Sequence, residues 1–230
     1  MPKPGPNLSE LPVFLDSRSE RGNVVIRRAS RKDTLQIAAL MDMASHGIEL
    51  WYWTCNRPLE QSILEFGSHL IQNDEGSLYH FSKVLLLEVE EEVAGGLIAY
   101  PAEVDTNVSD NLEVHTEHFP SAYQQLVDLE KHVTSGWYLL AIAVYPEFRG
   151  LGLGRALMIY AESLVRKSGQ NRISLIVDSG NGPARHLYES LGFKEVARNN
   201  QIAYPGSPPS GDWILYGKDL SEPDTGLASA

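Results

Sequence analysis

The stretch Val144-Tyr145-Pro146-Glu147-Phe148-Arg149-Gly150-Leu151-Gly152-Leu153-Gly154-Arg155 carries most of the information about the fold of this chain. It follows an apolar run, residues 137–144, which predicts a strand buried on both faces. It leads into residues 154–167, whose apolar spacing predicts a helix. The glycines remove side chains where the backbone turns into that helix. Backbone N–H groups and the positive helix end then face outward together, which suits a phosphate or pyrophosphate. The alternative is a tight turn that is rich in glycine for steric reasons only.

Two other phosphate-binding loops fit this stretch less well. A dinucleotide fingerprint needs G-x-G-x-x-G, but Arg155 and Leu157 stand where the third glycine would fall. A Walker A loop needs Gly-Lys followed by Ser or Thr, and the sequence has neither combination.

On both sides of the loop, strand and helix patterns alternate. A capping box is expected at Ser30 to Asp33, and an acidic hairpin at Glu90-Glu91-Glu92. The strands are predicted at 24–28, 83–90, 92–100, 137–144, 173–177, 193–198 and 212–218. The helices are predicted after Ser30, at 58–73, at 120–133, at 154–167 and at 183–191. The fold class is therefore mixed α/β, with about seven strands and four or five helices.

Length and composition place these elements in one domain. The 230 residues divide into a proline-rich arm (1–21), a single domain (22–220) and a polar tail (221–230). The lone Cys55 excludes an internal disulfide framework and a Cys-rich zinc site, and no metal is expected. No apolar run is long enough to span a membrane. The net charge of −11 argues against nucleic acid as a partner. A soluble, cytoplasmic protein is expected.

The loop is similar to the acyl-CoA-binding signature of the GNAT superfamily of N-acetyltransferases, Gln/Arg-x-x-Gly-x-Gly/Ala. Arg149-Gly150-Leu151-Gly152-Leu153-Gly154 matches it fully. A second signature of that superfamily follows in the expected order. Ile176-Val177-Asp178-Ser179-Gly180-Asn181 is a strand end that carries an Asn, and residues 184–193 resemble A-x-x-L-Y-E-x-x-G-F. The resemblance covers residues 137–218 closely and residues 24–100 only in element order. It implies a mostly antiparallel mixed sheet in which a splayed pair of parallel strands binds CoA.

The resemblance also implies roles for individual residues. Pantetheine would lie along Ile142, Ala143 and Val144. Asn181 would contact the cofactor arm, Ala184 would leave room for it, and Tyr188 would protonate the departing thiolate as general acid. The pyrophosphate would lie on the backbone N–H groups of Arg149, Gly150, Leu151, Gly152, Leu153, Gly154 and Arg155. From spacing alone, Tyr188 is equally an aromatic residue on the core face of a short helix, and Asn181 a helix N-cap.

The general base is harder to assign. The expected base is Glu103, at the end of a strand, with Glu117, His118 and Glu49 as further candidates. Each of them is also explained as a surface charge, and some members of the superfamily use a water chain instead. Cys55 follows Trp51-Tyr52-Trp53-Thr54, an aromatic setting typical of a core or a pocket wall rather than of a reactive thiol.

The expected function is transfer of an acetyl group from acetyl-CoA to a primary amine, in a small molecule or a peptide, by direct attack in a ternary complex. A cationic acceptor is suggested by an acidic segment without Lys or Arg, opposite a basic segment at residues 146–172. Two alternatives are a non-catalytic acyl-CoA-binding module and a transferase with another acyl donor. A homodimer through the apolar strand at 212–218 is also a hypothesis, and the same strand is equally explained as a buried strand of one monomer. The carboxylates of the acidic segment are Glu88, Glu90, Glu91, Glu92, Glu103, Asp105, Asp110, Glu113, Glu117, Asp128 and Glu130.

Overall fold

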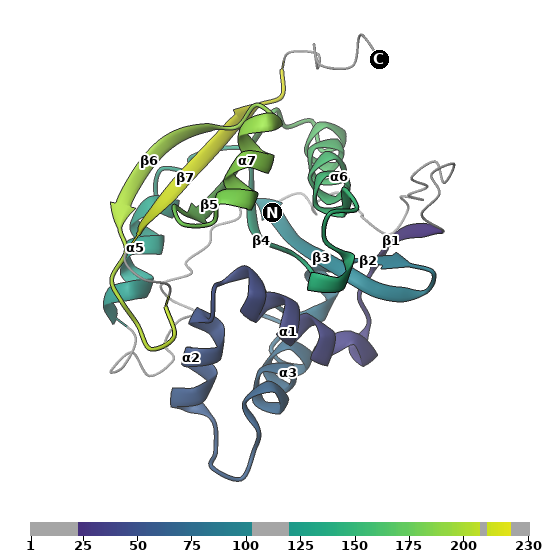
Figure 1. Ribbon diagram of the computed structural model, residues 1–230, viewed down its shortest axis with the longest axis vertical. Helices are drawn as coiled ribbons and strands as arrows, with labels where there is room; N and C mark the ends of the chain where they lie inside the picture. The colour runs from purple at the N-terminus through teal and green to yellow at the C-terminus, as the bar shows by residue number, and fades with distance from the viewer. Residues whose placement is uncertain (1–22, 103–119, 208–210, 222–230) are drawn as a thin grey trace, which may run out of the picture.

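The computed structural model describes residues 23–102, 120–207 and 211–221, with the side chains of 120–122 left aside. These residues form seven strands in a single sheet, with six α-helices around it (Figure 1). The strands are β1 (Val24–Arg28), β2 (Val84–Val89), β3 (Glu92–Pro101), β4 (Trp137–Val144), β5 (Arg172–Asp178), β6 (Lys194–Asn200) and β7 (Asp212–Asp219). The helices are α1 (Thr34–Ala44), α2 (Ile48–Asn56), α3 (Ile63–Asn73), α5 (Pro120–Glu130), α6 (Leu153–Lys167) and α7 (Gly182–Ser190).

The strands follow the order β1-β2-β3-β4-β5-β7-β6, and all neighbours are antiparallel except β4 and β5. That parallel pair is short. It joins Trp137 with Ile173, Tyr138 with Ser174 and Leu139 with Leu175. The register between β3 and β4 shifts beside Leu139, which leaves Leu140 as the extra residue of a β-bulge. Beyond the bulge, β4 and β5 share no further pairs in the described residues, so the two strands splay apart.

The sheet is covered on both faces. One core cluster joins it to α6 and α7 through residues such as Leu157, Ala161 and Tyr188. A second cluster joins the opposite face to α1, α2 and α3, and a third lies between α2, α5 and β7. In Figure 1, α6 and α7 lie above the splayed strands and α1 to α3 lie below them. Different helices therefore cover the two faces of the sheet at the splayed region.

Two predicted local signals are present. Ser30 and Asp33 form the predicted capping box, with the backbone N–H of Ser30 2.7 Å from Asp33 Oδ2. The acidic hairpin pairs Val89 with Glu92, and Glu90 and Glu91 both adopt positive φ. The helix expected from residue 58 begins later. It starts after Ser62, whose hydroxyl accepts from the Glu65 N–H in a second capping box.

Sequence analysis missed one helix and misplaced one side chain. Residues 48–56 form a helix, α2, that was not predicted from the sequence. Its N-cap is Gly47, which has no side chain to form a capping hydrogen bond, so the usual sequence signal of a helix start is missing. Cys55 is exposed on that helix rather than part of the core or a pocket wall. The apolar strand at 212–218, β7, lies inside the sheet between β5 and β6, and the hypothesis of a homodimer through it stays a prediction. No described helix is both long enough and apolar enough to cross a membrane.

Candidate functional site

The glycine-rich turn lies between the short 3₁₀ turn Pro146–Phe148 and α6. Gly150 and Gly152 have φ values of 76° and 77°, which side chains disfavour, so the turn requires glycine for its backbone geometry. Gly152 is the N-cap of α6 and contributes no capping side chain. The first N–H groups of a helix have no partner within it, so this helix end suits an anion. The steric and the phosphate-binding interpretations of the glycines are therefore compatible.

Two arginines flank this helix end, and each is anchored by a hydrogen bond. Arg149 Nε donates to the carbonyl of Val144 at 3.1 Å. Arg155 Nη2 donates to Ser190 Oγ at 2.7 Å, which ties the start of α6 to the end of α7. Both side chains remain exposed at the surface around the turn. Their charges therefore reinforce the positive end of the helix.

The second half of β4 provides an open strand edge beside this turn. Trp137, Tyr138 and Leu139 are buried, whereas Ile142, Ala143 and Val144 are only partly buried. The prediction that both faces of this strand are buried thus holds for its first half. A strand edge without a partner can pair with an extended ligand through its backbone groups. The residues predicted to line pantetheine all lie on this open half.

Asn181 is the N-cap of α7, and it also contacts the turn between α1 and α2. Its Oδ1 accepts from the Ala184 N–H at 3.2 Å, which leaves Nδ2 to face His46 Nε2, also at 3.2 Å. His46 Nε2 is thus the side-chain partner of the Asn181 amide. It lies in the turn between α1 and α2 with φ of 56°, an uncommon value for a residue other than glycine. The cofactor motif is thus joined directly to the turn between α1 and α2.

Tyr188 is 5% exposed and belongs to the core cluster beneath α6 and α7. Its ring contacts Phe193 and Tyr216, with centroid separations of 5.9 Å and 6.4 Å. Burial raises the pKa of its hydroxyl, so the phenol is neutral near pH 7. Among the described residues, nothing accepts a hydrogen bond from that hydroxyl. The side chain has a core position and a proton available for donation.

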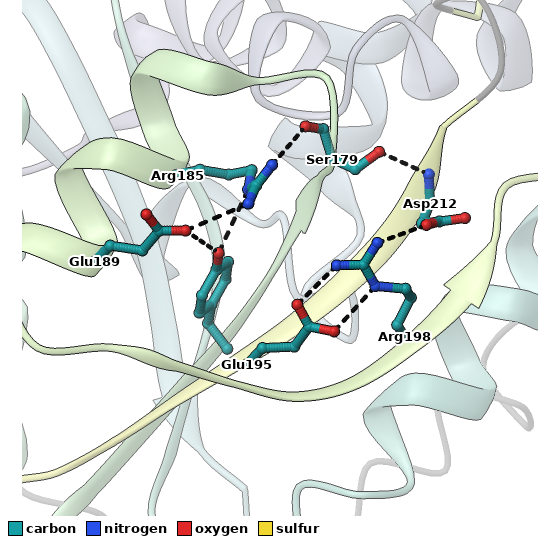
Figure 2. A network of polar contacts seen from close by, with 7 residues as sticks. Ser179, Arg185, Glu189, Glu195, Arg198 and Asp212 are labelled. Carbon is teal, nitrogen blue, oxygen red and sulfur yellow. Dashed lines mark hydrogen bonds and ion pairs between the residues drawn. The ribbon is translucent and has the colours of Figure 1, made fainter.

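A polar network fixes α7 against the end of the sheet (Figure 2). Arg185 donates to the carbonyl of Ser179 at 3.2 Å and lies 3.4 Å from Glu189. The hydroxyl of Tyr216 on β7 donates to Glu189 at 2.6 Å. These contacts explain why Arg185 is better understood as a positioning residue than as a catalytic one. They hold the helix that carries Tyr188.

The candidate bases divide into two groups. Glu103, Glu117 and His118 lie outside the described residues. Glu49 is 4% exposed on α2, and Tyr123 Oη donates to its Oε1 at 2.8 Å. Burial raises the pKa of Glu49, although hydrogen bonds from Tyr123 and Tyr79 oppose this effect. It is a buried group, not the surface charge that sequence alone allowed.

A second buried carboxylate, which sequence analysis counted only as part of the acidic segment, acts together with Glu49 on the phenol of Tyr123. Glu130 ends α5, and the hydroxyl of Tyr138 on β4 hydrogen-bonds to it. Burial raises the pKa of Glu130 to about 7, against the opposing effect of that hydrogen bond. A titratable group of this kind is suited to proton transfer near neutral pH. No local sequence signal distinguished it, because α5 meets β4 only through the fold.

The described members of the acidic segment are not gathered at one place. Glu88 pairs with Arg27 at 2.7 Å, and Glu90 accepts from the Asn23 N–H. Asp128 forms an exposed pair with Lys131. Glu130 instead contacts Tyr138, in the half of β4 that is paired with β5. In the described ranges, no group of three or more His, Cys, Asp or Glu side chains is placed to hold a metal ion.

Comparison with known proteins agrees with this geometry. The sequence model of the acetyltransferase (GNAT) family matches residues 45–193. Mycothiol acetyltransferase of Thermomonospora curvata is 41% identical over 68 residues, which are 30% of this chain and 22% of that protein. [Ribosomal protein bS18]-alanine N-acetyltransferase of Escherichia coli is 38% identical over 83 residues, 36% of this chain and 55% of that protein. The chain thus spans between about a fifth and about half the length of these curated relatives.

Solved structures extend the likeness to most of the described fold. Polyamine N-acetyltransferase of Drosophila melanogaster aligns with a TM-score of 0.57 at 17% identity, over 86% of this chain and 100% of that one. An N-acetyltransferase from Staphylococcus aureus aligns with a TM-score of 0.56 at 21% identity, over 84% of this chain and 100% of that one. At such identities the likeness concerns the fold alone. The family match, in contrast, covers more than half of the 230 residues, and it includes the glycine-rich turn, the open edge of β4 and the start of α7. The chain therefore belongs to the GNAT family of acetyltransferases.

Proposed function

We propose that this protein transfers an acetyl group from acetyl-CoA to a primary amine. The observation that carries the proposal is the parallel pair β4–β5, which is joined at only three residue pairs and splays beyond Leu139. The open edge of β4 leads from this splay to the glycine-rich turn at the start of α6. An extended chain ending in a pyrophosphate fits such a path, because the strand edge offers backbone groups and the helix end offers N–H groups.

In this proposal, the amine nitrogen attacks the thioester carbonyl directly, and no covalent enzyme intermediate forms. The nitrogen gains the acyl carbon and loses a proton, while the carbon–sulfur bond breaks. Backbone N–H groups beside the bulge at Leu140 are suited to stabilise charge that develops on the carbonyl oxygen. Cys55 has no role in this scheme, since it is exposed on α2.

Tyr188 is the proposed general acid, which donates its phenolic proton to the leaving thiolate. Because its pKa is raised, the phenol of Tyr188 stays protonated near pH 7 and can donate this proton to the leaving sulfur. Glu103 remains the base suggested by the sequence. Glu49 and Glu130 are described, buried carboxylates with raised pKa values that are suited to the same task, and Glu130 is better matched to neutral pH.

The acceptor is a primary amine of undecided type. The names of the curated relatives indicate different acceptors, an alanine of a ribosomal protein for one and mycothiol for another. The experiment below decides between transfer and a non-catalytic acyl-CoA-binding module, and repeating it with succinyl-CoA tests the hypothesis of a different acyl donor.

Titration calorimetry with acetyl-CoA tests the proposal first. We expect micromolar binding by the native protein and at least about tenfold weaker binding by Gly152→Trp, whose indole would cover the helix end. Gly152→Asn is the matched control, because Asn tolerates the left-handed backbone at this position and adds little bulk. A panel of amines with detection of the released thiol then tests transfer. Folded native protein that does not bind acetyl-CoA would contradict the proposal, and binding without thiol release would favour the non-catalytic module.

A further inference from the structure

The turn between α1 and α2, residues 45–47, is attached through α1 to one of the two splayed strands. Helix α1 packs on the open half of β4, where Ala143 and Leu40 belong to the same core cluster. Tyr145, which directly follows β4, donates its hydroxyl to the carbonyl of Gln36 in α1 at 3.2 Å. The position of the turn is therefore set by its attachment to β4.

The same turn contacts the other splayed strand through His46. The Nε2 atom of His46 lies 3.2 Å from Nδ2 of Asn181. Asn181 in turn donates its backbone N–H to the carbonyl of Asp178, the last residue of β5, at 3.0 Å. Because β4 and β5 share no pairs beyond Leu139 in the described residues, these contacts connect the two strands across their opening.

His46 makes this contact from a backbone conformation that most side chains avoid. Its φ is 56°, and the next residue, Gly47, has a φ of 88°. Left-handed backbone at a residue other than glycine persists only where the surrounding contacts hold it. Here the hydroxyl of Tyr204 donates to the carbonyl of His46 at 3.1 Å, and the ring of Tyr204 stacks on Trp51 of α2. The turn is thus held in the form that directs the imidazole toward Asn181.

The contact with His46 sets the direction of the Asn181 amide. Its Oδ1 accepts from the Ala184 N–H at 3.2 Å, so this atom is committed to capping α7. Its Nδ2 carries two hydrogens, of which one serves His46 and the other remains for a ligand. Both residues are only partly buried. An amide that is held by two contacts before a ligand arrives loses less conformational freedom when the ligand binds.

From this arrangement we propose that His46 is a positioning residue for acetyl-CoA. It directs the Asn181 amide toward the pantetheine arm, and it holds the open ends of β4 and β5 at a fixed separation. His46 acts through Asn181 and does not need to touch the cofactor. The inference rests on the proposed function, because it takes acetyl-CoA as the ligand of the splayed strands. It adds a residue that lies outside the two signature motifs, which fall within residues 137–218.

Two substitutions separate the side-chain contact from the backbone conformation of residue 46. Asn tolerates left-handed backbone as His does, but its shorter side chain does not reach Asn181 from this position. Gln is less suited to that backbone, but its amide ends where Nε2 lies and supplies both a donor and an acceptor. A role of the contact therefore predicts that His46→Gln resembles the native protein and that His46→Asn does not. A role of the backbone alone predicts the opposite order.

Titration calorimetry with acetyl-CoA on the full-length protein measures the effect. We expect His46→Asn to bind acetyl-CoA about tenfold more weakly than the native protein, and His46→Gln to stay within about threefold of it. Adenosine 3′,5′-diphosphate is the part of CoA that lacks pantetheine. It should bind all three proteins equally, because it has no arm that would pass Asn181.

Hydrogen exchange gives a readout that does not depend on catalysis. The N–H groups of Ser45, Gly47 and Ile48 are hydrogen-bonded at the turn, so their exchange reports on its opening. Acetyl-CoA should slow this exchange in the native protein, because the bound ligand fixes Asn181 and Asn181 fixes His46. The protection should be lost in His46→Asn and should return in His46→Gln.

A double substitution tests whether His46 acts through Asn181. Asn181→Ser keeps a side chain that caps α7 but removes the amide. On that background His46→Asn should weaken acetyl-CoA binding no further, because the contact is already absent. His69→Asn is the matched control, since His69 Nδ1 lies 3.1 Å from Asn73 Nδ2 on an exposed part of α3. It should change neither acetyl-CoA binding nor exchange at the turn, and thermal unfolding checks that each variant is folded.

Three results would overturn the inference. They are native affinity for acetyl-CoA in His46→Asn, weaker binding by His46→Gln than by His46→Asn, and an undiminished effect of His46→Asn on the Asn181→Ser background. Failure of the transferase proposal looks different, because the variants then keep their expected order of acetyl-CoA affinity while no amine releases thiol. Native protein that binds no acetyl-CoA would overturn both.

Discussion

Tyr188 shows how one residue serves both the core and the chemistry. Its ring packs between Phe193 and Tyr216, while its hydroxyl has no acceptor among the described residues. Tyr188→Phe keeps the packing and removes only the proton. We expect kcat to fall about 100-fold or more, as for loss of a general acid, with little change in stability. Steady-state kinetics measures the fall in kcat, and thermal unfolding measures the stability. An unchanged kcat would indicate that Tyr188 has a purely structural role.

Asp33 gives a second prediction at the scale of a residue. Burial would raise the pKa of Asp33, but hydrogen bonds from Arg27 and Ser30 outweigh it and lower the pKa to about 2. The ionised form is therefore stabilised in the folded state, and this stability is present above pH 4 and lost as the pH falls toward 2. Asp33→Asn should cost about 2 kcal/mol at pH 7 and almost nothing near pH 2. Urea unfolding at both pH values measures the difference, and a loss that does not depend on pH would contradict the explanation.

Among individual residues, those in strong local motifs were predictable from sequence. The glycines of the turn, the capping box at Ser30 and the N-cap role of Asn181 follow from short patterns. Glu130 and His46 did not stand out, because their environments come from elements distant in the chain. The role of Glu103 as base stays a prediction, since it lies outside the described residues.

At the scale of elements, the contact between α2 and α3 depends on one glycine. A Cβ at Gly67 would lie 2.7 Å from the indole of Trp53. Gly67→Ala gains about 1 kcal/mol of helix propensity, but overpacking costs about 1–3 kcal/mol, so a net loss of stability is expected. Gly182→Ala is the matched control, because nothing lies within 4 Å of the added atom. Thermal unfolding should show a lower Tm for the first variant alone, and equal Tm values would refute the close contact.

Periodicity and turn chemistry predicted most elements close to their observed bounds. The buried strand at 137–144 and the helix after the glycines are examples. Helix α2 was missed because it starts at Gly47, whose φ is 88°, and is rich in aromatic residues that are poor helix signals. Its burial against α3 and β6–β7 stabilises it in place of local propensity. The expectation for 58–73 began too early because Pro58 resembled a first-turn proline, whereas Ser62 is the true cap.

Buried carboxyl groups make the stability of the whole molecule depend on pH. Burial raises the pKa values of Asp42, Glu49 and Glu130, the last from 4.5 to about 7. The folded protein thus keeps protons that the unfolded chain releases, so the free energy of unfolding falls as the pH rises from about 5 to about 8. Tm should be higher at pH 5.5 than at pH 8, and Glu130→Gln should flatten this difference. Repeating the scans in high salt separates the effect from general repulsion, and a flat native profile would contradict it.

The family resemblance predicted a mostly antiparallel sheet with one splayed parallel pair, and the structure confirms it, whereas the order β1-β2-β3-β4-β5-β7-β6 was not predicted. Composition and periodicity alone gave no strand order. For the same reason, the apolar character of β7 left two interpretations open, because a strand flanked by two others is as apolar as one at a dimer contact. The residues of α5, β7 and the turn after α1 come together only when the chain folds.

The short pairing of β4 with β5 also matters during synthesis. Residues 24–144 emerge from the ribosome before β5, and they already contain the antiparallel strands β1 to β4. Until β5 emerges, the outer edge of β4 is an apolar strand edge with nothing beside it, a template for pairing with another nascent chain. Even in the finished molecule only three residue pairs close that edge. Holdase chaperones that bind extended apolar segments are therefore expected to engage the nascent chain in the interval between the release of β4 and that of β5.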